Sequence, residues 1–233
     1  MKRLFARSAL AACLTLLSVA SYGQNPIPIS FVPAGIGAPG TYILTQDWTD
    51  SSSAGSAINV TANDVTIDLN GHHISCTIPN NQLVGVHLVD VSNVSVKNGE
   101  ISGFQYGVFM DHSGTSSNVD FGNLVDSLRL ENNQYGVACL SNTGCVVRNC
   151  QIEGGWMGVG FGGGEANHAS NNLTTGAEFG YYGSGPHYFD SNYANKCAFG
   201  IYATSSATKL RFNTTTNCNT AVVGGTSELA LDQ

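Results

Sequence analysis

Short runs of alternating apolar and polar residues, broken by Gly, Asn or Ser, fill most of the chain after residue 58. Alternation with a period of two predicts half-buried β-strands of a few residues each. No long window carries the apolar spacing of an amphipathic helix. The sequence therefore predicts an all-β chain made of many short strands and turns.

Matching residues recur along the chain at a nearly constant distance. Phe189 and Leu210 are like positions one step apart in the second half, and Ile67 and Val96 are separated by a longer step in the first half. A repeat of this length made of short strands is typical of a β-solenoid, in which each coil stacks on the one before it. A leucine-rich repeat would need a dense framework of leucines, and a propeller blade needs roughly 40 residues. The pattern predicts a β-solenoid with coils of about 21–29 residues.

Stacking places residues one repeat apart above one another, at the strand spacing of about 4.8 Å. Two apolar columns are expected to face the inside of the solenoid. The first contains Ile67, Val96, Val125, Val147, His168, Phe189 and Leu210, and the second contains Ile74, Ile101, Leu130, Ile152, Leu173 and Ala194. A third column, formed by Asn171, Asn192 and Asn213, predicts a ladder at a turn, where side-chain amides bond to the backbone.

Two stretches, ANDVTIDLNGHHI (62–74) and VSNVSVKNGEISGF (91–104), resemble the right-handed parallel β-helix, or pectate-lyase-like, superfamily. Residues Pro39–Leu44 resemble the segment in which the first coil of that family begins. The resemblance covers about residues 38–225 and implies a right-handed parallel β-helix. It implies no single activity, because the superfamily contains lyases, hydrolases, esterases, epimerases, adhesins and phage tailspikes. The characteristic motifs of its polygalacturonases, pectin methylesterases and epimerases are absent from this chain.

A column of charged residues lies beside the inward valines, and its signs alternate over most of its length. It contains Asp68, Lys97, Asp126, Arg148, Ala169, Asp190 and Arg211. If neighbours pair, the column is a surface ladder that sets the register of the coils, and each pair contributes about 0–1 kcal/mol. If they do not, it is a polar strip that holds a saccharide. In that case Lys97 and Arg148 would hold a uronate carboxylate, and Asp126 would bind calcium or act as a base.

Histidines occur at three places where chemistry has to be considered. Asp111 and His112 form the nearest acid–histidine pair, but adjacent strand residues point to opposite faces, which argues against a catalytic dyad. His72 and His73 follow a turn, and the sequence nearby offers no third metal ligand. His168 falls in the apolar column and is expected to be buried and neutral. Because no zinc-finger spacing of Cys and His is present either, the sequence predicts no metal site.

Aromatic or other large residues precede the central glycine of each coil. This position is occupied by Tyr106, Tyr135, Met157, Phe179 and Phe199. Such a column is typical of a core or of a stacked ladder. Trp156, next to Met157, should face the opposite way and is the aromatic residue best suited to stack on a sugar ring. The candidate substrate-binding residues are therefore Lys97, Asp126, Arg148 and Trp156.

The N-terminal segment (1–23) has the features of a secretory signal peptide, with basic residues at Lys2, Arg3 and Arg7 before an apolar run. This run is shorter than the stretch of about 20 residues that spans a bilayer. Cys13 lies too early for lipoprotein cleavage, so the protein is expected to be secreted or periplasmic. The next segment (24–57) would open and cap the solenoid, followed by the β-helix (58–225) and a tail (226–233). Because this tail is short for a cap, a homodimer through the C-terminal end is expected.

Charge and cysteine content limit the kinds of partner and the cellular location that fit this chain. The chain has 16 acidic and 9 basic residues, for a net charge of −7, and lacks the basic stripe that binds nucleic acid. Removal of the signal peptide leaves six cysteines, which suits disulfides in an exported protein. Cys197 and Cys218 are one repeat apart and are predicted to form a disulfide. The pairing of Cys76, Cys139, Cys145 and Cys150 is left open.

Three functions remain compatible with the sequence. The first is a secreted enzyme, a lyase or hydrolase, that acts on a polysaccharide. The second is a non-catalytic module for carbohydrate binding or surface adhesion, and the third is a structural solenoid. The expected partner in the first two is a polysaccharide, with no nucleic acid and no membrane span, and calcium is the only cofactor considered. Pairing within the charged column decides between a cleft and a structural ladder.

Overall fold

A computed structural model describes residues 25–51, 55–78, 82–112 and 120–227. The predicted signal peptide lies outside these residues, as does most of the predicted tail. Every named element in the described ranges is a β-strand, which confirms the all-β prediction. Among the described residues, no helix has the length and apolar character needed to cross a membrane.

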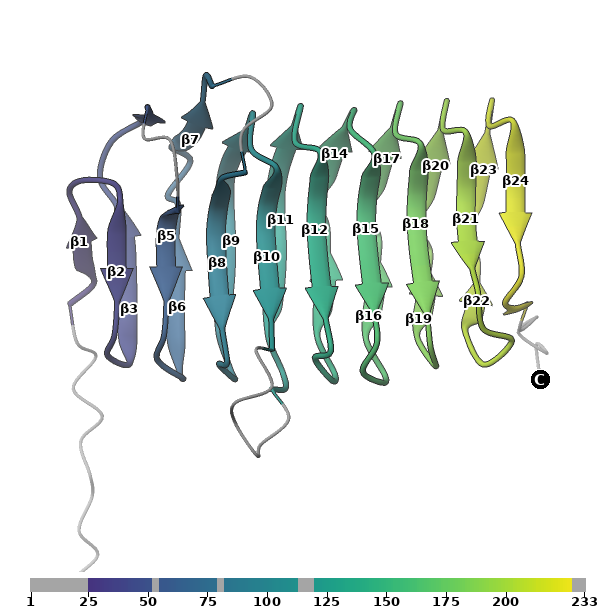
Figure 1. Cartoon of the computed structure of the whole chain (residues 1–233), viewed down its shortest axis with the longest axis horizontal. Coiled ribbons are helices and arrows are strands. Elements are labelled where there is room, and N and C mark those ends of the chain that lie inside the picture. Colours follow the sequence, from purple (N-terminus) through teal and green to yellow (C-terminus); the bar gives the residue numbers. More distant parts are fainter. Residues whose placement is uncertain (1–24, 52–54, 79–81, 113–119, 228–233) are drawn as a thin grey trace, which may run out of the picture.

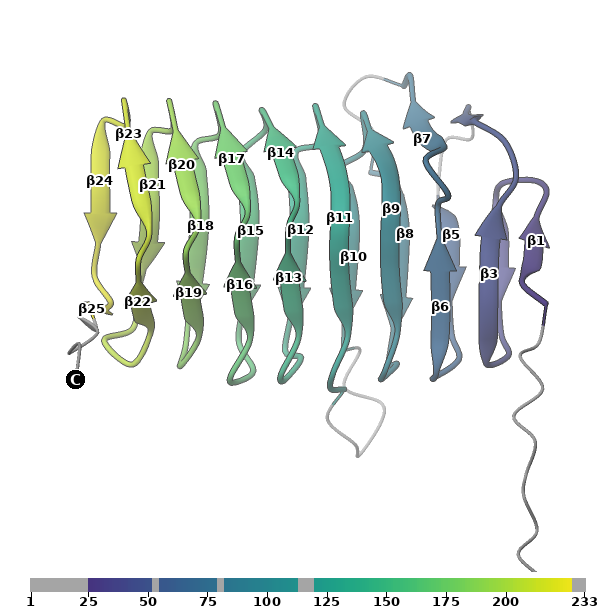
Figure 2. The same cartoon turned by 180° about the vertical axis from the view of Figure 1, so that it is seen from behind.

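The strands form two sheets, in which strands of successive coils lie side by side (Figures 1 and 2). The smaller sheet, sheet B, has nine strands that all pair in parallel. Its strands are β2 (Ala34–Ile36), β5 (Ser56–Val60), β8 (Val84–Val89), β10 (Tyr106–Asp111), β12 (Tyr135–Leu140), β15 (Met157–Gly162), β18 (Phe179–Ser184), β21 (Phe199–Ala203) and β24 (Thr220–Val223).

The larger sheet, sheet A, has sixteen strands arranged as a main row and an arm. The main row contains β1 (Ile27–Ile29), β3 (Gly40–Leu44), β6 (Val65–Asp68), β9 (Ser95–Ser102), β11 (Leu124–Glu131), β13 (Val146–Arg148), β16 (His168–Ser170), β19 (Tyr188–Asp190), β22 (Lys209–Arg211) and β25 (Thr226–Ser227). The arm contains β4 (Trp48–Asp50), β7 (His73–Cys76), β14 (Gln151–Glu153), β17 (Leu173–Thr175), β20 (Tyr193–Asn195) and β23 (Thr214–Thr216). The long strands β9 and β11 pair with strands of both the main row and the arm. Each coil therefore has three straight sections, in the main row, the arm and sheet B, around one apolar interior.

The two predicted apolar columns are inside the coil, with one correction in each. Val147 pairs in register with Ala169, and Ala169 with Phe189, so Ala169 takes the inward position predicted for His168. Ile152 pairs with Thr174, which is fully buried, whereas Leu173 is 38% exposed. Both errors have the same cause. The coil that follows Val147 and Ile152 is one residue longer than the constant repeat assumed from the sequence, so each inward position falls one residue later than predicted. The coils shorten along the first column, from the long step that joins Ile67 to Val96 to the short step that joins Ala169 to Phe189.

The asparagine ladder exists, but its first member is Asn172 rather than Asn171. The Asn172 side chain donates to Asn192 Oδ1 at 3.0 Å, and the Asn192 side chain donates to Asn213 Oδ1 at 3.1 Å. Asn171 instead has a positive φ of 55° and forms the bend before the ladder, a conformation that asparagine tolerates well. The ladder therefore fills the turn between the main row and the arm with paired amides, of which Asn172 and Asn192 are buried.

A column of glycines brings successive coils of sheet B into close contact. It contains Gly85, Gly107, Gly136, Gly158, Gly180 and Gly200. A Cβ atom at any of them would lie 2.5–2.7 Å from the carbonyl oxygen of the next residue in the column. The column ends at Ala221, whose own coil is the last of sheet B in the described chain. Glycine is therefore required here by the backbone of the neighbouring coil, not by a turn.

The cysteines lie close to one another in two places. Cys139 and Cys145 are both fully buried, and a hydrogen bond between their thiols raises the pKa of Cys139 well above its usual value. Cys197 and Cys218 are also neighbours, as their spacing of one repeat predicts, and both have free thiols in this structure. Their disulfide stays a prediction, as does the homodimer through the C-terminal end.

Candidate functional site

The charged column stands on sheet A in the predicted order, except that Ser170 replaces Ala169. Its neighbouring charges are paired with each other. Lys97 Nζ lies 3.5 Å from Asp68 Oδ2, and an Arg148 guanidinium nitrogen lies 2.8 Å from Asp126 Oδ2. Pairing of this kind favours a ladder that sets the register of the coils. The roles in saccharide binding given to Lys97, Asp126 and Arg148 stay predictions.

Asp126 has most of its acceptor capacity in use. Besides the Arg148 pair, it accepts hydrogen bonds of 2.9 Å from Asn149 Nδ2 and from Ser127 Oγ. Burial raises the pKa of Asp126, but these bonds and the Arg148 charge lower it by more, so the net pKa lies below its usual value. The carboxylate is thus held ionised among partners of the chain itself.

Arg148→Ala is expected to lower the free energy of unfolding by no more than about 1 kcal/mol, because the pair is partly exposed to solvent. A carboxylate with a lowered pKa stabilises the fold above its unfolded pKa and loses that contribution as the pH falls. The difference between wild type and variant should therefore be complete near neutral pH and be lost in acid, as the pH falls through the lowered pKa of Asp126. Urea denaturation of both proteins near neutral pH and in acid measures this. A loss well above about 1 kcal/mol at neutral pH would contradict the description of the column as a surface ladder.

The outer face of sheet B carries a continuous row of aromatic side chains. This aromatic row consists of Tyr106, Tyr135, Trp156, Phe179 and Phe199. Tyr106 and Tyr135 stack with ring centroids 4.6 Å apart, and Phe179 and Phe199 stack at 5.0 Å. Trp156 bridges the two pairs, with centroids 5.2 Å from Tyr135 and 5.3 Å from Phe179. The column predicted as core or ladder is therefore an outward ladder, half-buried by its own stacking.

Trp156 takes the place in this row that the sequence pattern gave to Met157. Met157 pairs in register with Tyr135 and Phe179 but is only 5% exposed, whereas Trp156 is 43% exposed. A Cβ atom on Gly160 would lie 2.1 Å from Met157 Sδ, so the Met157 side chain lies over this glycine. Trp156 is exposed as predicted, but it belongs to the row instead of facing away from it.

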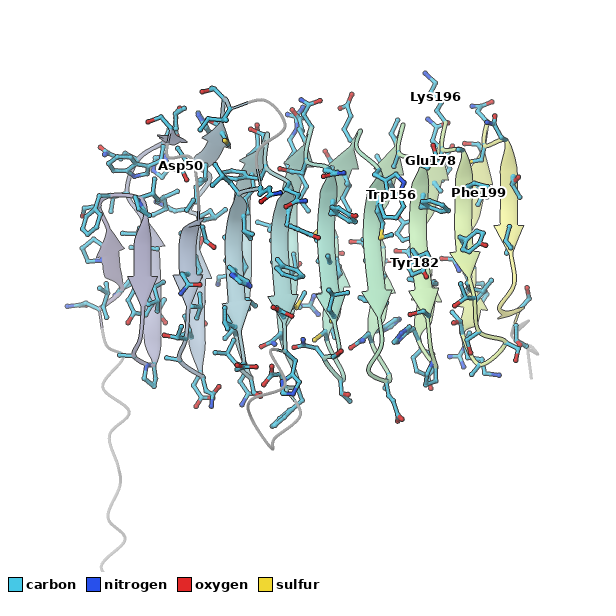
Figure 3. The ribbon with its side chains drawn as sticks, viewed as in Figure 1. Asp50, Trp156, Glu178, Tyr182, Lys196 and Phe199 are labelled. Carbon is cyan, nitrogen blue, oxygen red and sulfur yellow. The ribbon has the colours of Figure 1, made fainter. Side chains whose placement is uncertain are left out.

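Two tyrosines widen the row at its C-terminal end. Tyr182 and Tyr202 pair in register on β18 and β21, and their ring planes are parallel to within 6°. The Tyr202 ring is turned by 78° from Phe179 and by 82° from Phe199. Figure 3 shows Trp156, Tyr182 and Phe199 on the front sheet, with Glu178 near Trp156. Tyr182 and Tyr202 are one repeat apart, and this spacing could have revealed them as a pair.

The electrostatic character of this face is neutral to acidic. As the structure describes them, the nine strands of sheet B contain no lysine or arginine. Asp111 is close enough to His87 and Tyr106 to affect both, although burial has the larger effect and lowers the pKa of His87. A sulfated or uronate polymer would need cationic partners that these strands do not supply.

A cleft of about 800 Å³ lies at the edge of the row, between the arm of sheet A and sheet B. Its described lining is mostly polar and uncharged, and includes Gln82, Gln105, Asn132, Asn133 and Gln134. Gln105 and Gln134 each directly precede an aromatic residue of the row. Amide groups thus border the aromatic rings on this side, a combination that sequence reasoning missed.

The histidines considered in the sequence analysis do not contact the aromatic row, and one of them, His168, differs from its prediction. His168 points outward next to Tyr188, with ring centroids 6.1 Å apart, so its predicted place in the core is wrong. His72 and His73 both face Asp47, at 2.9 Å and 3.4 Å. His112 lies at a corner between two aspartates, described further below.

The family of the chain follows from a comparison with known families. The profile described as "Right handed beta helix region" matches residues 84–233, more than half of the sequence. The chain belongs to the right-handed β-helix family. This confirms the handedness that the resemblance implied, and the coils of sheets A and B are the repeats of this family.

Solved structures with a similar fold include a galactohydrolase and two iota-carrageenases. A 1,3-alpha-1,4-beta-D-galactose-4-sulfate-3,6-anhydro-D-galactose-2-sulfate 4 galactohydrolase aligns with a TM-score of 0.61 and 11% identity, over 80% of this chain and 59% of its own. An iota-carrageenase complexed to iota-carrageenan fragments aligns with a TM-score of 0.56 and 13% identity, over 78% and 48%. The iota-carrageenase of family GH82 from A. fortis gives a TM-score of 0.51 and 14% identity, over 70% and 47%.

These likenesses show the fold alone, since the identities are between 11% and 14%. The chain spans about half the length of the structures that it resembles. No curated protein matches the sequence.

Proposed function

We propose that this right-handed β-helix protein binds a neutral polysaccharide along the aromatic row of sheet B. The observation that carries the proposal is the unbroken row from Tyr106 to Phe199, with Trp156 exposed at its centre. Sugar rings present apolar C–H faces, and exposed aromatic rings are well suited to cover them because they combine an apolar surface with little loss of conformational freedom on binding.

The direction of the row fits an extended chain. Each coil contributes one ring, and successive rings lie 4.6–5.3 Å apart. A polymer lying along the solenoid axis would therefore contact several rings at once. Many weak contacts along one molecule give an overall affinity that none of them gives alone.

The polar surroundings favour a neutral polymer. Sugar hydroxyls need amide donors and acceptors, and the exposed side chains of Gln82 and Gln134 line the cleft beside the row. The strands of sheet B, as described, carry no lysine or arginine to pair with sulfate or carboxylate groups. We propose binding and not cleavage, because Asp126, the predicted base, is on the other sheet and paired with Arg148, and Lys97 is paired with Asp68. Secretion, which the N-terminal sequence predicts, would place the protein where such polymers occur.

Trp156→Ala is expected to weaken retention on the preferred polysaccharide by about 10-fold or more, since loss of an aromatic anchor at the centre of a binding surface costs about 1–3 kcal/mol. The full chain is passed over immobilised neutral polymers (β-glucan, xylan, mannan) and over iota-carrageenan and polygalacturonate. Reducing ends are measured in the same fractions.

Phe212→Ala is the matched control, because Phe212 is 67% exposed and lies next to β22 of sheet A. It should bind as the wild type does. Retention of none of the neutral polymers, or equal retention of the Trp156→Ala variant, would refute the proposal. Release of reducing ends would show that the protein is an enzyme.

A further inference from the structure

One corner of the solenoid brings together an aspartate of one coil and a histidine and an aspartate of the next. Asp90 follows β8, whereas His112 and Asp120 both belong to the connection between β10 and β11. The backbone N–H of Asp90 donates to the carbonyl of Asp111 at 3.1 Å, which holds the two coils together at this corner. All three side chains are largely shielded from solvent, with side-chain exposures of 22%, 16% and 5%.

Their ligand atoms are grouped around one point. His112 Nδ1 lies 3.3 Å from Asp90 Oδ1 and 3.1 Å from Asp120 Oδ2, and all three atoms lie within 4.8 Å of one another. In a tetrahedral zinc site, with bonds of about 2.0–2.2 Å, neighbouring ligand atoms are about 3.4 Å apart. The two separations from His112 Nδ1 are close to this value.

Two carboxylate oxygens face a single nitrogen in this group. Nδ1 of an imidazole carries at most one proton, and that proton can point to only one acceptor. Both the Asp90 and the Asp120 oxygen lie within 3.3 Å of this nitrogen, and the Asp120 side chain is only 5% exposed. A dication between the three atoms would bind the nitrogen lone pair and both oxygens.

The donor set indicates the class of metal. One imidazole nitrogen and two carboxylate oxygens suit a divalent transition metal such as Zn²⁺. Ca²⁺ takes six to eight oxygen ligands, and Mg²⁺ also prefers oxygen, so both should bind here more weakly. Three protein ligands would leave one position for water or another small ligand.

We infer that Asp90, His112 and Asp120 bind one divalent transition-metal ion, with Zn²⁺ the best fit. The inference is independent of polysaccharide binding, because none of the three residues belongs to the aromatic row. It replaces the expectation, drawn from the sequence, that the protein has no metal site, since the ligands come from two connections of successive coils.

The test is titration of the chelator-treated full chain with Zn²⁺, and with Ca²⁺ and Mg²⁺, by calorimetry. We expect one Zn²⁺ per chain and at least about 100-fold weaker binding to His112→Gln, because even loss of a group behind a ligand costs about 10–100-fold. Asp90→Asn should weaken binding as well, and circular dichroism verifies that both variants remain folded. His168→Gln, with a half-exposed histidine elsewhere, should bind as the wild type does.

Co²⁺ serves as an optical probe to separate this site from the thiols. Tetrahedral Co²⁺ held by nitrogen and oxygen gives visible bands without the near-ultraviolet thiolate band. A thiolate band would assign the metal to the cysteines and overturn the inference. So would absence of binding to the wild type, or unchanged binding to both His112→Gln and Asp90→Asn.

Discussion

Gly158→Ala is expected to lower the free energy of unfolding by about 3 kcal/mol, the upper part of the range for overpacking of a closed interior. The new Cβ would lie 2.5 Å from the Gly180 carbonyl oxygen and 2.5 Å from Thr174 Cγ2. The first contact cannot be relieved by a side-chain rotation, because the oxygen belongs to the backbone of the next coil. In a chain of this size, such a loss should lower the melting temperature by about 10 °C.

Gly35→Ala is the matched control. Gly35 is also in a strand of sheet B, but nothing lies within 4 Å of a Cβ built there. The two variants make the same chemical change, so thermal denaturation of both isolates the contact with the next coil. Equal melting temperatures for the two variants would show that the coils can move apart to admit a methyl group, contrary to the description of the glycine column.

Acid is expected to weaken the fold through His187, before most carboxylates titrate. The His187 side chain is fully buried, neither ring nitrogen has a hydrogen-bond partner, and burial lowers its pKa to about 4. An unfolded histidine titrates near pH 6.5, so below that pH the unfolded chain binds a proton that the folded chain refuses. The contribution is complete above about pH 6.5 and is lost as the pH falls to about 4, which amounts to at most about 3 kcal/mol.

His187→Leu should remove most of this pH dependence between about pH 6.5 and 4, because leucine has a similar volume and does not titrate. Denaturant unfolding at several pH values measures it. His168→Gln, at a half-exposed histidine, should keep the slope of the wild type. His87, whose pKa burial also lowers, would account for the part that remains. An unchanged slope in His187→Leu would mean that His187 takes up a proton in the folded state as easily as in the unfolded one.

The fold could be predicted from the sequence because its residues repeat from coil to coil. Small residues near the turns limited how accurately individual residues could be assigned to a column. The inward positions from Ile67 to Val147 and from Phe189 to Leu210 were predicted correctly, because large apolar residues alternate with polar ones there. The errors at Ala169, Thr174 and Asn172 fall after the glycine run at 162–164. In this region the sequence pattern allows either of two adjacent residues to occupy the column position. Only the hydrogen bonds between coils show which of the two does so.

The candidate sites were harder to predict than the fold, because they depend on contacts between side chains and not on the repeat length of the coils. The charged column was placed on the correct strands, but its pairing depends on the conformations of Lys97 and Arg148, which a sequence does not specify. Trp156 belongs to the row because the Met157 side chain lies over Gly160. This exchange of Met157 for Trp156 cannot be predicted from the repeat length. The group of Asp90, His112 and Asp120 comes from the connections of two successive coils and matches no known metal-binding spacing, so no motif could reveal it.

The unequal coil lengths have a consequence for how such a molecule can change over time. The long coils of the first half and the short coils of the second place their strands in the same sheets with an unbroken register, so the difference is taken up at the corners. In-frame insertions and deletions at these corners can thus reshape the rim of the molecule while the stacked strands keep their neighbours. Evolution can vary the edge of the solenoid independently of its interior, and a foreign peptide grafted at a corner would be displayed on a rigid support.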